Sequence, residues 1–412
     1  MPHIPVLLLG AGAGTPSTPV PATRTPTFEQ SKELSLLIYK PTIGSYVPAG
    51  VFQGTIGREV DAYQHTIAAL GGYDSASFTI NDRLDRLEDW LDRLGYHVEV
   101  YNPDLVLIWE GFINRVSLNL GGLAVVRGNL TDIGNRVTCV YSTVDTSTTE
   151  PTIGMREPTT VANDTTSQGR YGIIQKILSV GGATQVTAEQ IRDTWLNENK
   201  EPETSQSYSS GGGQTTVSVE CAGYNKWLDL YAYNQIASTG TLNVSTAIQN
   251  VLAADVNGLF STDYTRITAN TLQTQQYVND DDTAWAYIKY LVSQGDAADN
   301  RYLFGIYAGR RAVYEVQPTD TAYLQRITDN RQDVETPTGQ IVKPWDVLPG
   351  RWLLYPDFLV GRITPSNKRD DSRYEFIERV TFTAPWSLSH TGSKASTLPQ
   401  KLAKLGLGGT GA

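Results

Sequence analysis

The chain has 412 residues, of which 18% are charged and 40% are apolar, and its net charge is −10. The apolar fraction, with 22 Tyr and 8 Trp, excludes a disordered chain, and the acidic balance argues against a dedicated nucleic-acid binder. No apolar run approaches the roughly 18 residues of a membrane-spanning helix, so we expect a soluble, multi-domain, β-rich protein with no membrane partner.

Near the N-terminus, a short apolar run leads into glycines, in the sequence VLLLGAGAG of residues 6–14. A dinucleotide-binding fingerprint needs a helix directly after its glycines, and Pro16, Pro19 and Pro21 forbid that helix. Residues 1–30 are therefore predicted to be an extended arm that becomes ordered only against a partner. The segment has no positive n-region, so we expect the protein to fold in the cytosol with reduced thiols.

Residues 31–145 are predicted to form a β-barrel-like domain with one helix. Ala76, Phe78 and Ile80 alternate as in a strand, and a helix is expected from Asn81 or Asp82 to Gly95. The pair Gly121-Gly122 between two apolar runs predicts a hairpin. A strand at residues 137–141 is expected to complete this set.

Residues 146–215 are rich in Thr, Ser and Gly and are predicted to be an insertion or linker with one short helix. The capping box of residues 187–190, Thr-Ala-Glu-Gln, is expected to open that helix. The insertion would separate the first barrel-like domain from the middle of the chain.

Residues 216–330 are predicted to be an α+β middle domain. One helix is expected over Val244, Ile248 and Leu252, and a second from the acidic residues 280–282, acting as its cap, to Gly295. A hairpin is expected across Gly309-Arg310, with Arg310 and Arg311 as solvated turn residues and phosphate contact as a minor alternative.

Residues 331–390 are predicted to be a C-terminal β domain, followed by a flexible tail over residues 391–412. The fold class predicted for the whole chain is α+β and β-rich. In this arrangement, small split β-barrel-like domains flank a helix-containing middle region.

No known catalytic motif is present, since the sequence lacks a nucleophile elbow, a Walker loop and an H-E-x-x-H pattern. Cys139 and Cys221 cannot build a disulfide framework or a zinc site, and the two thiols are expected in one barrel. The four histidines are isolated along the chain, at positions His3, His65, His97 and His390. We therefore predict no catalytic residue, no cofactor and no metal site, although a glycosidase carboxylate pair follows no spacing rule.

The excess of tyrosine and tryptophan suits a protein–protein interface better than a sugar-binding platform, because no converging polar groups are evident. Five aromatic residues are the candidates for a subunit interface: Tyr224, Trp227, Tyr231, Tyr302 and Tyr307.

Several segments spread along the chain carry recognisable motifs. The first domain has GYDSASF at residues 72–78, a tryptophan-to-glycine segment at residues 90–95 and IWEGFI at residues 108–113, followed by Asn135-Arg136-Val137. Taken together, these segments resemble the opening domain of bacteriophage tail and baseplate proteins, which is a small tube domain. Residues 221–224 with Leu228, then residues 282–295 and 305–307, resemble inner domains of the tail hub. The hub joins the tail tube to the central spike and is related in fold to type VI secretion spike proteins.

The resemblance implies a structural, non-enzymatic virion component at the tail tip, enclosing the DNA channel during ejection. It implies self-association, with a homotrimer favoured and a hexamer as the alternative. Tube, distal-tail and tip or spike proteins would be its neighbours, and viral DNA would pass without specific binding. Two other functions stay open: a distal tail ring or host-carbohydrate-binding adsorption protein, and a cell-wall hydrolase of the tail tip.

Overall fold

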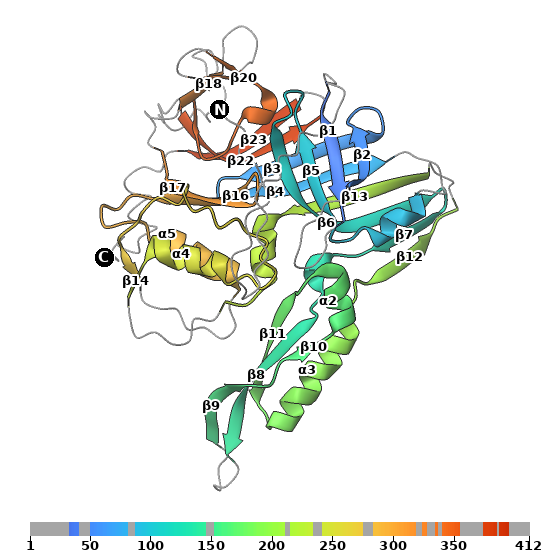
Figure 1. Cartoon of the computed structure of the whole chain (residues 1–412), viewed down its shortest axis with the longest axis vertical. Helices are drawn as coiled ribbons and strands as arrows, with labels where there is room; N and C mark the ends of the chain where they lie inside the picture. The colour runs from blue at the N-terminus through green and yellow to red at the C-terminus, as the bar shows by residue number, and fades with distance from the viewer. Residues whose placement is uncertain are drawn as a thin grey trace, which may run out of the picture.

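The computed structural model describes residues 33–40, 50–80, 87–145, 152–210, 215–233, 241–274, 283–318, 324–327, 334–336, 340–354, 374–384 and 387–394. The predicted N-terminal arm and almost all of the predicted C-terminal tail lie outside these residues. The described part is strand-rich, with helices in the middle of the chain (Figure 1), which confirms the predicted β-rich α+β class.

The main sheet is built on seven strands in which every neighbour is antiparallel. Their spatial order is β2 (Gly50–Thr55), β1 (Ser35–Tyr39), β5 (His97–Tyr101), β6 (Leu107–Leu120), β13 (Thr215–Gly223), β4 (Gly71–Ile80) and β3 (Val60–Ala68). A single bridge between Ile56 and Val60 links the chain after β2 to β3. No sheet among the described strands is closed, so the predicted barrel is not confirmed.

One face of this sheet supplies the core, because apolar residues alternate along each strand. Ala76, Phe78 and Ile80 are buried, as their alternation predicts. Trp90 of the 3-10 helix η1 (Glu88–Asp92) packs edge-on against Phe78, with ring centroids 6.2 Å apart. The predicted helix thus appears as this short 3-10 segment, followed by Gly95 at φ 78°, while residues 81–86 lie outside the described part.

The Gly121-Gly122 hairpin prediction is confirmed by the pairing of β6 with β7 (Leu123–Arg127). β7 also pairs with β12 (Thr204–Tyr208), and the 3-10 helix η2 (Leu130–Asp132) follows β7 along the chain.

A separate four-stranded sheet projects from the rest of the molecule (bottom of Figure 1). It contains β8 (Arg136–Asp145), β9 (Thr152–Pro158), β10 (Ala162–Asn163) and β11 (Gln175–Gly182), accompanied by helices α2 (Thr165–Tyr171) and α3 (Gln185–Asn199). We call residues 136–199 the arm sheet unit. The placement of residues 137–141 in the first barrel is therefore wrong, because β8 pairs in parallel with β11 and is covered by α3.

The predicted helix in the insertion exists, but it begins at Gln185 rather than after Thr187. The side chain of Thr184 is the cap and accepts a hydrogen bond from the backbone N–H of Thr187. Cys139 lies in β8 and Cys221 in β13, so the two free thiols belong to different sheets and not to one barrel.

The middle region begins with the 3-10 helix η3 (Tyr224–Asp229). It continues with β14 (Leu242–Asn243), α4 (Val244–Ala253), β15 (Gln273–Thr274), α5 (Ala284–Ser293), β16 (Tyr302–Tyr307) and β17 (Arg311–Val316). Both predicted helices and the predicted hairpin are confirmed. The cap of α5 is Thr283, whose side chain accepts from the N–H of Ala286, and the acidic residues 280–282 lie outside the described part.

Strand β16 pairs in parallel with the beginning of β4, which joins the middle region to the main sheet. The C-terminal strands join at the β3 edge of the main sheet, next to β4, where β22 pairs antiparallel with β3. This last part contains β18 (Leu324–Ile327), β19 (Val334–Glu335), β20 (Ile341–Val342), η4 (Pro344–Asp346), β21 (Trp352–Leu354), β22 (Tyr374–Thr383) and β23 (Ser387–Lys394). Strand pairing therefore crosses the predicted domain boundaries, which themselves stay a prediction.

None of the helices in the described ranges combines the length and the apolar character that crossing a membrane requires.

Candidate functional site

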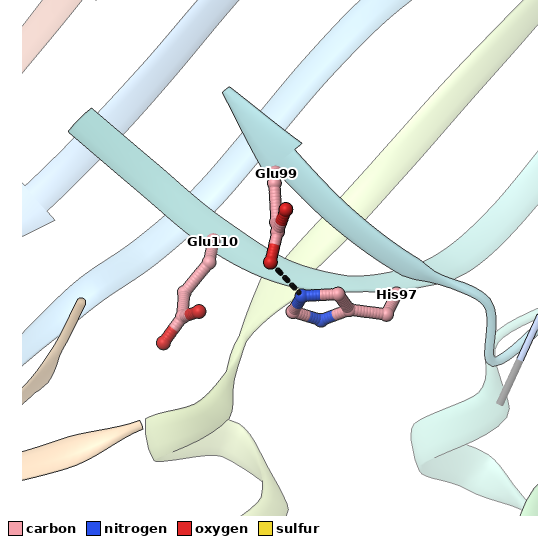
Figure 2. Close-up of side chains that lie close together, drawn as sticks. All are labelled: His97, Glu99 and Glu110. Atoms are coloured by element: carbon pink, nitrogen blue, oxygen red, sulfur yellow. Dashed lines mark hydrogen bonds and ion pairs between the residues drawn. The ribbon is translucent and has the colours of Figure 1, made fainter. Parts of the chain in front are cut away.

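A cluster of ionisable side chains lies on the face of β5 and β6 opposite the main core. His97 and Glu99 alternate along β5 with the core residues Val98 and Val100, so strand periodicity places both on the other face. Glu110 of β6 is the register partner of Glu99 and projects to the same side. Figure 2 shows the three side chains gathered together from these two adjoining strands.

The middle region seals this cluster from solvent. Tyr224 at the beginning of η3 and Arg310 in the turn between β16 and β17 contact it. Only 3% of His97, 9% of Glu99 and 1% of Glu110 is exposed. Two carboxylates that face each other across strands repel, so their burial requires strong compensating contacts.

Hydrogen bonds stabilise Glu99 as a carboxylate. Its Oε1 lies 3.0 Å from Nε2 of His97, and its Oε2 accepts from the hydroxyl of Tyr101 at 2.9 Å. On the other side of the imidazole, Nδ1 of His97 is 2.7 Å from the hydroxyl of Tyr224. Burial alone would raise the pKa of Glu99, but the hydrogen bond and the charge of His97 hold that pKa below its ordinary value.

Glu110 is held less completely. Its Oε1 accepts a hydrogen bond from the backbone N–H of Arg310, whereas its Oε2 has no hydrogen-bond partner among the described residues. Burial raises the pKa of Glu110, although the nearby His97 and Arg310 oppose that shift. The cluster therefore contains one carboxylate that is fully paired and one that is buried with an unsatisfied oxygen.

Arg310 corrects the expectation of a solvated turn residue. Its exposed fraction is 2%, its φ of 53° lies in the left-handed region, and its guanidinium carbon is 5.5 Å from the centroid of the Tyr224 ring. The hairpin turn is folded against the main sheet rather than into solvent. Its neighbour Arg311 pairs with Asp263.

Chemically, the cluster offers one imidazole and two carboxylates whose ligand atoms all lie within 4.8 Å of one another. This donor set can share protons or hold a cation. A hydrolytic role fits poorly, because a polysaccharide cannot reach carboxylates that are this deeply buried.

Sequence reasoning treated His97 as an isolated histidine and missed this cluster. The available signal was the alternation of His97 and Glu99 within one strand, next to a Trp-Glu-Gly strand that carries Glu110. The sequence could not supply the strand register that places Glu110 opposite Glu99. It also could not show that residues such as Tyr224, more than one hundred positions away, cover the cluster.

Four of the five predicted interface aromatics are buried within the single chain, and Tyr307 is half-buried. Tyr224 and Trp227 both pack against Phe112, with ring centroids 5.8 and 5.4 Å away. Tyr231 donates to the carbonyl of Val251, and Tyr302 stacks on Tyr314. These contacts join η3 and β16 to their own chain, and a role of these residues in a subunit interface stays a prediction.

No protein-family model and no curated protein matches this chain. Among solved structures, the chain is similar to a crystal structure described as the tail protein from Neisseria meningitidis MC58. The TM-score is 0.35 at 9% sequence identity, and the superposition covers 85% of this chain and 92% of the other.

Proposed function

We propose that this chain is a structural component of a bacteriophage tail tip or baseplate. In this proposal it is the hub that joins the tail tube to the tip or spike and surrounds the DNA channel. It acts as a homotrimer next to tube, distal-tail and tip proteins, and it performs no catalysis.

The proposal rests on where the structure brings together the segments that resemble phage tail proteins. Gly72, Gly111, Gly223 and Gly305 come from four of the resembling segments, and all four lie where β4, β6, β13 and β16 meet. A Cβ on Gly111 would lie 2.2 Å from the carbonyl oxygen of Ala222, and one on Gly223 would lie 1.8 Å from that of Tyr73. Motifs from distant segments thus build one junction, as expected of a shared fold rather than chance similarity.

Two surface properties also support an assembly role. Ile153 and Met155 of the projecting strand β9 are 75% and 82% exposed, which is unusual for large apolar side chains on an isolated protein. The net charge of −10 suits a channel wall that does not retain DNA, because like charges repel phosphates.

The copy number of the chain in the assembled particle tests the proposal. We would reconstruct the tail end of purified virions without imposed symmetry. The hub role predicts three copies around the axis between tube and tip. Six copies in a ring would replace it with a distal-tail role, and copies away from the axis would favour binding to host carbohydrate, which a glycan array would then detect.

A further inference from the structure

We infer that His97, Glu99 and Glu110 form a buried binding site for one divalent transition-metal ion, held between the main sheet and the middle region. An imidazole with two carboxylates is a donor set that suits Zn²⁺ and Mn²⁺. The site does not depend on the proposed role in a phage tail.

The first argument is that each of the three side chains has one ligand atom held from outside the cluster. Tyr224 holds Nδ1 of His97, Tyr101 holds Oε2 of Glu99, and the backbone of Arg310 holds Oε1 of Glu110. Nε2 of the imidazole and Oε1 of Glu99 face each other at 3.0 Å, and together with a carboxylate oxygen of Glu110 they are the atoms that would meet on a shared ion. Outer contacts of this kind fix the orientation of ligands at metal sites.

The second argument is the unsatisfied oxygen of Glu110. Oε2 of this carboxylate is buried without a hydrogen-bond partner among the described residues, and the whole residue is 1% exposed. Figure 2 shows the Glu110 carboxylate beside the imidazole of His97 and the carboxylate of Glu99. An unpaired carboxylate oxygen costs stability in an apolar interior unless a cation or donor meets it.

The hydrogen bonds within the cluster do not meet the unsatisfied oxygen. Nε2 of His97 lies 3.0 Å from Oε1 of Glu99, and Oε2 of Glu110 has no hydrogen-bond partner among the described residues. A metal ion between the three ligands would meet that oxygen and would offset the repulsion between two carboxylates that are register partners on neighbouring strands.

The geometry requires only a small adjustment. Metal–ligand bonds of about 2.0–2.2 Å place the ligands of a tetrahedral ion about 3.5 Å apart. The imidazole and Glu99 are already closer than this, at 3.0 Å, and all three ligand atoms lie within 4.8 Å. A rotation of the Glu110 side chain, with its strand kept in place, would bring its carboxylate oxygen to bonding distance from an ion held by the other two ligands.

The test uses the full chain, stripped with a chelator and titrated separately with Zn²⁺ and with Mn²⁺ by calorimetry. We expect one equivalent per chain, with X-ray absorption showing a first shell of one nitrogen and carboxylate oxygens. Glu110→Gln and His97→Gln should each weaken binding at least tenfold. His65→Gln, which removes a buried histidine outside the cluster, should leave binding unchanged.

Folding of each variant is checked by near-ultraviolet circular dichroism, and the absorption spectrum of the wild-type chain answers the question even if a variant unfolds. Absence of Zn²⁺ and Mn²⁺ binding in the folded wild-type chain would overturn the inference. So would a first shell without nitrogen, or equal affinity in the folded Glu110→Gln variant.

Discussion

His65 shows how burial alone controls the charge of a single side chain. It lies in β3, is 2% exposed, and its Nδ1 is 2.9 Å from the hydroxyl of Tyr63. Because charging it would cost solvation, burial lowers its pKa from 6.5 to about 3. The depressed pKa means that the stability gained from the neutral ring is complete above pH 6.5 and is lost as the pH falls from 6.5 toward 3.

We therefore predict that the unfolding free energy of the wild-type chain falls more steeply than that of His65→Gln, by about 1.4 kcal/mol per pH unit within this window. Urea unfolding at several pH values between 7 and 4 measures the difference. Gln64→His, which places a histidine on the exposed face of the same strand, should add no such slope. Parallel pH profiles for the wild type and His65→Gln would contradict the prediction.

At the same scale, the sequence did not distinguish His65 from His97, although only His97 belongs to the ionisable cluster. His65 and His97 are both buried, and both lie beside a tyrosine hydroxyl. Tyr63 is two residues from His65, but Tyr224 reaches His97 from 127 positions away. A contact between residues two positions apart can be predicted from the sequence. The cluster on β5 and β6, with its contacts from Tyr224 and Arg310, can be predicted only when the strand register is known.

At the scale of elements, the glycines of the β4–β6–β13–β16 junction determine how closely the strands approach. Gly223 has a φ of −72°, which any residue adopts, so only steric contact with Tyr73 forbids a side chain there. We predict that Gly223→Ala destabilises the chain by about 1–3 kcal/mol or prevents folding.

Gly169 in α2 is the matched control, because a Cβ there would meet nothing within 4 Å. Gly169→Ala should stabilise the chain by about 0.5–1 kcal/mol through helix propensity. Thermal and urea unfolding of both variants measures these shifts. Similar stability in the two variants would show that the junction tolerates a wider spacing than the structure has.

Local elements could be predicted because their signals lie within a few neighbouring residues, whereas the cluster depends on contacts between distant segments. Helices α4 and α5 and the Gly121-Gly122 and Gly309-Arg310 hairpins follow from periodicity and turn chemistry within a few residues. The placement of β8 was wrong because its partner β11 is parallel and follows only after β9, β10 and α2. The burial of Arg310 was equally hidden, since it depends on how the hairpin docks on β6.

At the scale of the whole molecule, the described residues contain a large core and two small ones, one of which lies in the C-terminal strands around Leu353. The large core includes Cys221 and spans the main sheet and the middle region. The arm sheet unit has its own core of Cys139, Tyr141 and Ala188 between β8 and α3. Asn135 connects the large core with the arm sheet unit, since its amide donates to the carbonyl of Gly172 and accepts from the N–H of Ile174, each at 2.8 Å.

This division predicts that the arm sheet unit opens before the main sheet, because few apolar contacts hold it. The two free thiols report separately on the large core, which contains Cys221, and on the core of the arm sheet unit, which contains Cys139. Both are buried, and burial raises the pKa of each, so neither reacts with a thiol reagent until its sheet opens. In urea below the global unfolding midpoint, Cys139 in a Cys221→Ala variant should be labelled at least tenfold faster than Cys221 in a Cys139→Ala variant. Equal labelling rates with the same urea dependence would contradict this prediction and would show that the chain unfolds as one cooperative unit. The hydrogen bonds of Asn135 would then couple the unfolding of the arm sheet unit to that of the main sheet.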